Sequence, residues 1–326
     1  MSVERRLLYL SREDVEAVGL SSSEIMQAVD QALREKAMGR AQMPPKHWLT
    51  SGDRRFFSAM TSVLPAVGAS ACKWQSGSPD NQRYGLPFIT GLLILNDLET
   101  GAPLAIMDST WLTAQRTAAA TAVAARCLSV KSPRVVAIIG CGVQARTNFE
   151  MLRLAFPELT AIQAYDIVPQ ATQRYAEEMS ERHGARVTQC KTPRMAIEGA
   201  DIVVTCGPIT SQPDRVGELS WLKPGSLVVT LDYDCYWKPE ALAAADAIFT
   251  DDITQLEHLR EYGYFKGVRA IAGEVGDAIA EKLRGRSADS DKIFSINMGI
   301  ALEDVAVAWR IYSAALAQVR GLWLPW

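Results

Sequence analysis

The chain has 326 residues, of which 48% are hydrophobic and 22% are charged, and its formal net charge is −3. This composition is typical of soluble globular proteins, and the length allows two domains. The slight acidity excludes the basic surface of a nucleic-acid-binding protein. No window approaches the roughly 20 apolar residues that cross a bilayer, and the amino terminus lacks the pattern of a signal peptide. We therefore expect a cytoplasmic protein with no membrane or nucleic-acid partner.

The cysteines and histidines limit the kinds of metal site and catalytic mechanism that the chain can support. The six cysteines are scattered along the chain and form no C-x-x-C pair. This pattern indicates reduced thiols and no zinc site, so no bound metal is expected. With three histidines in the chain, a mechanism that needs a histidine base has few candidates.

The first third of the chain predicts mixed α and β structure. Residues 7–10 read as a strand, and apolar residues from Ile25 to Ala37 recur with helical spacing before Gly39, a C-terminal helix signal. Between residues 54 and 104, short apolar runs alternate with turn clusters, which predicts a largely antiparallel sheet. The alanine-rich stretch 109–128 predicts a helix.

From residue 135 onward, strands and helices alternate. Helices are predicted over 143–155 and 169–182, and a long amphipathic helix over 301–319. Repeated β-α-β units predict a parallel, doubly wound sheet, and therefore an α/β fold of the Rossmann type. Strands are predicted in the segments RVVAIIG, AIQAYD, ARVTQC, ADIVVTC, SLVVTL, DAIFTD and VRAIAGE.

A glycine-rich loop follows the first of these strands. Gly140, Gly142 and Ala145 form the pattern G-x-G-x-x-A, directly after an apolar run and at the start of a predicted helix. In dinucleotide-binding folds the first glycine permits a tight turn, the second lets the backbone approach a pyrophosphate, and the small third residue packs the helix closely. The helix N-terminus favours phosphate. The alternative is a glycine turn that only packs a helix.

Asp166 ends the next predicted strand, 21 residues after Ala145, where a ribose-binding acid belongs. A carboxylate there accepts hydrogen bonds from a ribose diol and repels a 2′-phosphate, and no arginine follows within four positions. We therefore predict NAD rather than NADP, with a strand-end cap as the alternative role of Asp166. The other residues assigned to the cofactor site are Val143, Gln144, Thr205, Cys206 and Met298.

Two carboxylates, Asp232 and Asp234, follow the apolar run 228–231. Aspartate is common where a strand turns into a loop, so both could be strand-end caps. Ligands of open α/β sheets bind at the carboxyl ends of parallel strands, so a catalytic role is the alternative. Alternation along a strand would place Asp232 on the same face as Asp234. There it could bind a substrate cation, or favour the protonated form of Asp234 by like-charge repulsion.

Five segments, in this order, resemble the ornithine cyclodeaminase/μ-crystallin family: LTAQRTAAATAVAA, GCGVQAR, LKPGSLVV, the Asp234 segment and GIALEDVA. The resemblance covers about residues 40–315. It implies an α+β substrate-binding and dimerisation domain (1–130 plus 300–326), completed by the C-terminal helix. An NAD(P)-binding Rossmann domain (131–299) and a homodimer are also implied. The implied activity is an NAD(P)-dependent amino-acid dehydrogenase or imine reductase, which transfers hydride at the Cα of an amino or imino acid.

The resemblance also assigns residues. Lys73 matches the family lysine near the substrate carboxylate, and Arg116 matches the carboxylate-binding arginine. Asp234 matches the acid near the reacting amino group or imine, and Thr117 and Ala145 fall where the cofactor is contacted. The set is chemically coherent, because a carboxylate substrate needs a cationic clamp and a reacting amine needs a base. From the residues alone, Lys73 could instead be a solvated strand-end lysine, and Arg116 an exposed helical arginine.

Several positions depart from the family pattern. Lys46 stands where the family often has a carboxylate-clamping arginine, and Phe88 stands where cyclodeaminases have a threonine. The pair 236–237 is Tyr-Trp in place of Pro-Gly, and FSINMG is one residue longer than usual. These departures argue against ornithine cyclodeamination and favour a bulkier or aromatic-lined pocket, in which we expect Lys46, Phe88 and Asp232 to bind substrate.

Two other activities stay open. One is an ornithine or lysine cyclodeaminase that releases ammonia and recycles its NAD internally. The other is a non-catalytic ligand-binding protein like μ-crystallin. The substrate side chain, the physiological direction and the pathway are not determined by the sequence.

Overall fold

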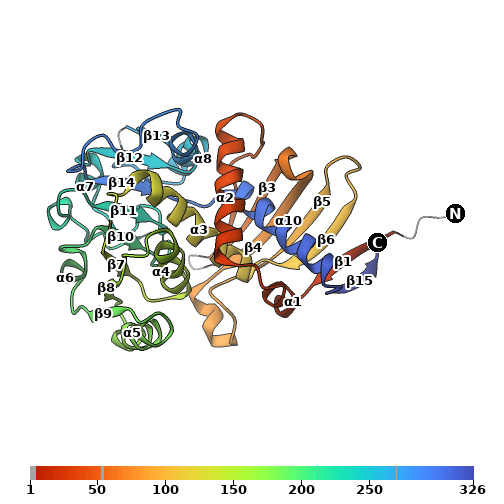
Figure 1. Ribbon diagram of the computed structural model, residues 1–326, viewed down its shortest axis with the longest axis horizontal. Coiled ribbons are helices and arrows are strands. Elements are labelled where there is room, and N and C mark those ends of the chain that lie inside the picture. The colour runs from red at the N-terminus through yellow and green to blue at the C-terminus, as the bar shows by residue number, and fades with distance from the viewer. Residues whose placement is uncertain (1–4, 53–54, 211, 269) are drawn as a thin grey trace. The chain divides into compact units, whose positions relative to one another are not determined.

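A computed structural model describes residues 5–52, 55–210, 212–268 and 270–326. The chain forms two compact units (Figure 1). The first comprises the chain up to residue 116 together with 300–326, and the second comprises 117–299. Within the described ranges, no helix is both long and apolar enough to cross a membrane.

The first unit contains a seven-stranded sheet in the order β15-β1-β6-β5-β4-β3-β2. Strands β3 to β6 pair antiparallel, as predicted, β2 pairs antiparallel with β3, and β1 pairs parallel with β6. Its elements are β1 (Arg6–Leu10), α1 (Arg12–Ala17), α2 (Ser22–Ala37), β2 (His47–Ser51), β3 (Arg55–Leu64), β4 (Ala69–Gly77), β5 (Ile89–Asp97), β6 (Pro103–Asp108), the start of α3 (Thr110–Leu128), α10 (Ala301–Ala317) and β15 (Leu322–Pro325).

Helix α10 covers one face of this sheet. It packs against β3, β4, β5 and α2, and its first residue is tied to β3 because the Ser62 hydroxyl donates to the Ala301 carbonyl (2.9 Å). Burial alternates along β4, so that Lys73 and Gln75 lie on the buried face. The apolar helix and the alternating strand together place polar side chains in the interior of this unit.

The second unit contains an eight-stranded sheet in the order β13-β12-β14-β11-β10-β7-β8-β9, and all of its pairings are parallel. Its elements are the end of α3, β7 (Val135–Ile139), α4 (Val143–Ala155), β8 (Ala161–Tyr165), α5 (Pro169–His183), β9 (Arg186–Gln189), α6 (Pro193–Ile197), β10 (Ile202–Thr205), β11 (Leu227–Thr230), α7 (Pro239–Ala243), β12 (Ala247–Thr250), α8 (Ile253–Glu261), β13 (Gly273–Glu274), α9 (Val275–Ile279) and β14 (Ile293–Ile296).

The strand predictions were wrong at four places. Strand β2 was not predicted, because strand-like runs were expected only from residue 54 onward. Of the segment 268–274, only two residues form a strand, β13, and residue 269 lies outside the described residues. Strand β14 was not predicted, although it lies between β12 and β11 inside the sheet. Strand β15 was also missed, and it pairs antiparallel with β1. Strand β13 has two residues, which is too short for a local pattern to mark its bounds.

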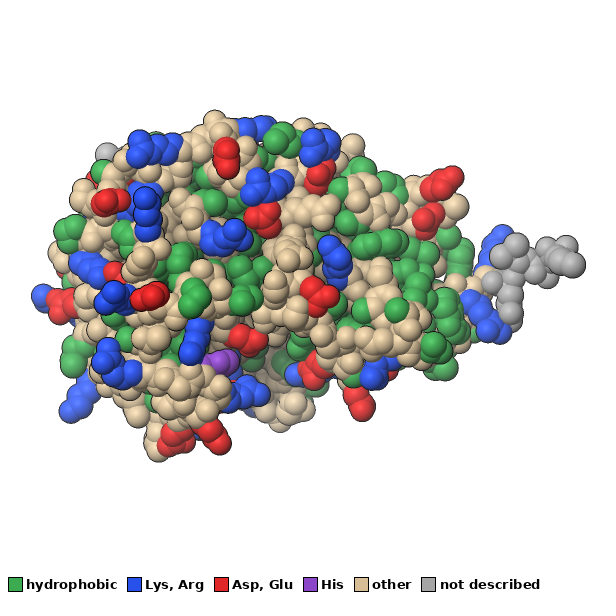
Figure 2. Space-filling view, viewed as in Figure 1, with side chains coloured by type: hydrophobic (Ala, Val, Ile, Leu, Met, Phe, Trp, Pro, Cys, Tyr) green, Lys and Arg blue, Asp and Glu red, His purple; other side chains and the backbone are tan. Residues whose placement is uncertain are grey.

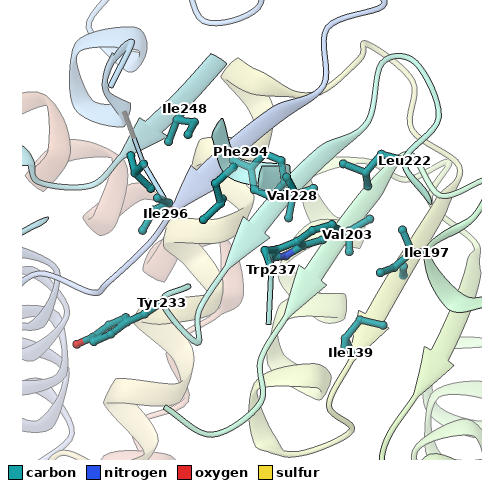
Figure 3. Packing of buried hydrophobic residues seen from close by; sticks show 14 of the residues in the cluster. Ile139, Ile197, Val203, Leu222, Val228, Tyr233, Trp237, Ile248, Phe294 and Ile296 are labelled. Atoms are coloured by element: carbon teal, nitrogen blue, oxygen red, sulfur yellow. The ribbon is translucent and has the colours of Figure 1, made fainter. Parts of the chain in front are cut away.

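Aromatic residues fill the core of the second unit. Trp237 is fully buried and packs edge-on against Phe294, with ring centroids 5.0 Å apart. In Figure 3, Trp237 lies beside Val203 and Val228, whereas Tyr233 lies apart from it with its hydroxyl pointing away. The structure therefore makes Trp237 a core residue, which corrects the expectation that it lines a substrate pocket.

Candidate active site

The glycine-rich loop makes a tight turn between β7 and α4. Gly140 has a positive φ of 96°, and a Cβ there would approach the Cys206 carbonyl oxygen to 3.0 Å. Gly142 caps α4, and a Cβ there would meet no atom within 4 Å. The loop therefore borders open space at the N-terminus of a helix of 13 residues. The residues present fit a dinucleotide pyrophosphate, which the helix N-terminus would stabilise.

Asp166 fastens this loop to the end of β8. Its Oδ2 accepts a hydrogen bond from the Cys141 backbone N–H (2.7 Å), and its Oδ1 accepts one from the Val168 N–H (2.8 Å). Ala145 is fully buried under the loop and Val143 is exposed, while Gln144 accepts a hydrogen bond from the Asn148 side chain. The structure thus brings the fingerprint residues and the predicted ribose acid together.

An arginine that the sequence analysis did not assign also holds the loop. Arg146 Nη1 donates to the carbonyl oxygens of Cys141 (2.9 Å) and Gly142 (2.8 Å). Its Nε donates to Glu178 (2.6 Å), and the guanidinium lies 5.7 Å from the centre of the Tyr175 ring. These contacts fix two carbonyl groups of the loop. Arg146 is the last residue of the motif GCGVQAR, and its place beside the glycine turn was the sequence feature that could have indicated a role in the loop.

The remaining predicted cofactor residues lie at several places. Thr205 ends β10, and its hydroxyl donates to Asp232 Oδ1 (2.7 Å). The Cys206 thiol donates to the Gly140 carbonyl (3.0 Å), so the loop after β10 contacts the glycine turn. Met298 is buried two residues after β14, and Thr117 is half-buried in α3.

The two aspartates lie in a turn, not on a strand. Strand β11 ends at Thr230, and Tyr233 between the aspartates has a positive φ of 61°. The expectation that alternation along a strand places Asp232 and Asp234 on one face was therefore wrong. Both side chains are nevertheless buried. Burial raises the pKa of Asp232 to about 7, although the Thr205 hydroxyl opposes the shift.

The two carboxylate oxygens of Asp234 differ in their hydrogen bonds. Its Oδ2 accepts hydrogen bonds from Arg215 Nη2 (2.9 Å) and from the Phe265 N–H (3.1 Å), and Arg215 Nε donates to its carbonyl oxygen (2.8 Å). Its Oδ1 is buried and has no hydrogen-bond partner among the described residues. Arg215 lies 19 residues earlier in an irregular loop, so no local pattern pointed to it.

In the first unit, the predicted cations form a buried ion network. Lys73 Nζ lies 2.8 Å from Asp304 Oδ1. Arg116 Nη1 lies 2.8 Å from Glu303 Oε2, and its Nε lies 3.0 Å from Asp304 Oδ1. Lys73 is 0% exposed and Arg116 is 4% exposed. The two alternatives, a solvated lysine and an exposed helical arginine, are therefore wrong.

A third cation, Lys46, acts on this network. Burial lowers the pKa of Lys73 to about 7, although the Asp304 carboxylate opposes the shift. The charges of Arg116 and of Lys46, which is also buried, lower it further. Lys46, Lys73 and Arg116 are thus three buried cationic side chains of the first unit, and Glu303 and Asp304 are the acids that pair with Lys73 and Arg116.

The two acids of α10 were quoted in the motif GIALEDVA but were given no role. Burial raises the pKa of Glu303, and the Arg116 charge opposes this shift. Phe88, the other predicted substrate residue, is half-buried immediately before β5, and its carbonyl accepts a hydrogen bond from the Ser78 N–H (3.0 Å). In the described ranges, no group of three histidine, cysteine or acidic side chains could hold a metal ion.

The second unit combines a parallel sheet with the glycine-rich loop at Gly140 and the acid Asp166, and the first unit contains buried cations. These features are typical of a dinucleotide-binding protein with a separate substrate-binding unit. Residues 6–318 match the model of the ornithine cyclodeaminase/mu-crystallin family. The chain belongs to that family. This confirms the family predicted from the sequence.

Two relatives cover nearly the whole chain. The nodulation efficiency protein NfeD of Rhizobium meliloti is 36% identical over 310 residues, which are 94% of this chain and 95% of the relative. The alanine dehydrogenase of Archaeoglobus fulgidus is 34% identical over 324 residues, 96% of this chain and 97% of the relative.

Two solved structures are similar over the same extent. An archaeal alanine dehydrogenase dimer with bound NAD has a TM-score of 0.89 and 32% identity, covering 98% of this chain and 99% of the other. The Δ1-pyrroline-2-carboxylate reductase of Thermococcus litoralis, in complex with NADH and L-proline, has a TM-score of 0.87 and 29% identity, covering 97% and 99%. These similarities confirm the predicted fold class.

Proposed function

We propose that the protein is an NAD-dependent oxidoreductase that acts at the Cα of an amino acid or its imine. In the oxidative direction, an amino acid and NAD⁺ give an imino acid, NADH and a proton. Water then releases ammonia from an acyclic imine. The observation that carries the proposal is the pair of features in one chain: a dinucleotide loop with an acid at the ribose position, and a cluster of three buried cationic side chains, Lys46, Lys73 and Arg116.

The cofactor residues act by binding. The open space at Gly142 and the N–H groups of α4 would take the pyrophosphate. Asp166, held by two backbone N–H groups, would accept hydrogen bonds from the ribose. When bound, the nicotinamide accepts or donates the hydride at Cα. Asp166 disfavours a 2′-phosphate, which supports NAD over NADP.

The cations of the first unit would bind the substrate carboxylate. Lys46, Lys73 and Arg116 lie in the unit's interior, where charge–charge interactions are strong. Arg116 is held by two carboxylates of α10, so its guanidinium is fixed before any substrate arrives. A fixed cation loses little conformational entropy on binding, which favours affinity.

Asp234 would move the proton. Oxidation at Cα requires the substrate ammonium group to lose protons, and a carboxylate with a free buried oxygen can accept one. Asp232, whose carboxyl group is buried without a cation partner in the contacts described, would keep its proton in neutral solution more readily than an exposed aspartate.

The relatives confirm the proposal at the level of class. The two similar structures contain an alanine dehydrogenase with NAD and an imine reductase with NADH and L-proline. An NAD-dependent enzyme of this family is therefore shown, whereas the substrate is part of our proposal. We expect a small monocarboxylic amino acid, because the two similar proteins are an alanine dehydrogenase and a reductase in complex with L-proline.

A substrate panel tests this function. The oxidative direction uses L-alanine, L-proline, L-ornithine and L-lysine with NAD⁺, and the reductive direction uses cyclic imines, or 2-oxo acids with ammonia, with NADH. Net change of NADH absorbance with one of these compounds is expected. Conversion of ornithine or lysine to a cyclic amino acid without net NADH would instead identify a cyclodeaminase. Binding without conversion of any compound would identify a binding protein.

We also infer a homodimer that pairs through the outer face of the first unit's sheet. Trp74 stands opposite Leu92 in the β4–β5 pairing and stacks on Phe57, which stands opposite Leu49. These side chains share one face, and Leu49, Trp74 and Leu92 are about half exposed. Hydrophobic side chains also gather over β5, β6 and β1 in Figure 2. A large exposed apolar patch is typical of an interface.

Six free thiols support the predicted cytoplasmic location.

A further inference from the structure

We propose that Arg215 is a positioning residue of this reaction, which keeps Asp234 an anion and directs its Oδ1 toward the substrate. The inference rests on the proposed role of Asp234. It assigns to Arg215 no contact with substrate. Its basis is the geometry of the carboxylate, in which Oδ2 accepts two hydrogen bonds and Oδ1 has no donor among the residues that the structure describes.

The Arg215 guanidinium donates hydrogen bonds to Asp234 at two positions. Arg215 Nη2 donates to the carboxylate Oδ2 and Nε donates to the backbone oxygen of the same residue. A two-point contact by a planar group fixes direction as well as distance. The side chain and the backbone of Asp234 are therefore held together, in a turn that is not part of a strand.

A second donor to the same oxygen comes from the core. The Phe265 N–H donates to Oδ2, and Phe265 is fully buried, with its ring 5.5 Å from the Tyr233 ring. With two donors on Oδ2, the carboxylate has little freedom to exchange its oxygens. A buried acceptor without a donor costs about 1–3 kcal/mol, so a substrate N–H that reaches Oδ1 would recover this energy.

The charges around Asp234 leave Arg215 as its counterion. In the described part of the chain, the titratable groups that interact with it are Arg215, Asp232, Cys235 and Tyr264. Burial raises the pKa of Cys235 and of Tyr264 to about 12, so both stay neutral over the usual assay range. Asp232 is an acid and opposes ionisation of its neighbour. The guanidinium is the group of this set that favours the anion.

The effect on the reaction has a definite sign. In the oxidative direction, a base must be unprotonated, so activity falls on the acidic side as the carboxylate gains a proton. Removing a positive charge 2.9 Å away favours the protonated carboxyl group. The acidic limb of the kcat profile should therefore move to higher pH when the guanidinium is replaced by a neutral group.

Two substitutions of Arg215 separate the effect of its positive charge from its effect on the orientation of the Asp234 carboxylate. Arg215→Gln removes both, and we expect kcat at pH 7 to fall about tenfold or more and the acidic limb to move up by about one pH unit. Arg215→Lys keeps the charge but loses the fork, so kcat should fall while the limb stays near its wild-type position. The assay uses the panel amino acid with the highest kcat/KM and saturating NAD⁺. Arg194→Gln, which removes an exposed arginine paired with Glu198, is the matched control and should behave as wild type.

The double variant Arg215→Gln/Asp234→Asn completes the test. If Arg215 acts through Asp234, the double variant should be no slower than Asp234→Asn alone. A lower kcat in Arg215→Gln with an unmoved limb, or additive losses in the double variant, would overturn the proposal and indicate a structural role. If Asp234→Asn itself keeps full turnover, the base assigned in the proposed function is wrong, which is a different result.

Discussion

Lys73 and Asp304 are 231 residues apart in the chain, yet they form an ion pair of 2.8 Å from which solvent is excluded. Arg116 contacts the same aspartate oxygen at 3.0 Å. One carboxylate of α10 thus holds the strand lysine and the helical arginine that we assign to substrate binding. The acids of GIALEDVA therefore organise the cation cluster of the first unit.

The first prediction concerns this ion network. Asp304→Asn keeps the shape but removes a charge shared by two buried cations, and breaking a buried pair costs about 3–5 kcal/mol. We expect a loss of that size in the free energy of unfolding, measured by urea titration. Glu16→Gln is the control, because it removes an exposed pair with Arg12 and should cost less than about 1 kcal/mol. Equal losses in both variants would contradict the network's importance.

The second prediction uses the two loop glycines. Gly142→Ala adds a methyl group that meets no protein atom, so thermal stability should be unchanged while NADH affinity falls about tenfold or more, since the methyl enters the space assigned to the pyrophosphate. Gly140→Ala forces an alanine into positive φ beside the Cys206 carbonyl, so it should lower stability. Isothermal titration and thermal melting measure the two effects. An undiminished NADH affinity in Gly142→Ala would place the dinucleotide elsewhere.

The third prediction concerns cofactor choice. The wild type should bind NADH at least about tenfold more tightly than NADPH, a difference of about 1.4 kcal/mol, and Asp166→Ala should narrow this ratio. Because Asp166 also holds two backbone N–H groups, the control is Asp201→Ala. Asp201 likewise accepts from two backbone N–H groups, of residues 134 and 135, but at the opposite end of the strands. Fluorescence titration gives the ratios, and a wild type that prefers NADPH would disprove the role of Asp166.

The fourth prediction concerns assembly. The protein should be a dimer at micromolar concentration by light scattering, and Trp74→Glu or Leu92→Glu should shift it to monomer, because a buried unpaired charge opposes association. Leu154→Glu changes an exposed leucine of α4, in the second unit, and should leave the dimer intact. A monomeric wild type over this concentration range would exclude the interface.

The fifth prediction concerns pH and Asp232. Its pKa is raised to about 7 in the folded protein. Between about pH 4 and pH 7 the folded chain therefore holds a proton that the unfolded chain has lost, so this group destabilises the protein increasingly as pH rises through that window. Asp232→Asn stays neutral and can still accept from Thr205. Its unfolding free energy should therefore gain on that of the wild type by up to about 1.4 kcal/mol per pH unit across the window. Parallel pH curves would contradict the shift.

Local patterns accounted for much of the second unit. The helix predicted over 143–155 has those bounds in the structure, because a glycine turn begins it and its apolar period is regular. The fingerprint and Asp166 are also local, since a β-α-β unit joins residues close in sequence. Strands β14 and β15 were not predicted, and their places in the sheets are set by pairing with strands distant in the chain.

The sequence by itself determined the alternation of strands and helices, the dinucleotide loop and the residue types of the candidate site, because these depend on neighbours along the chain. Only the tertiary structure decided which charges meet. Asp304 reaches Lys73 because α10 packs across β4, and Arg215 reaches Asp234 because the loop after β10 lies beside the turn after β11. An ion pair over such separations depends on packing, and packing also excludes the water that would otherwise weaken it.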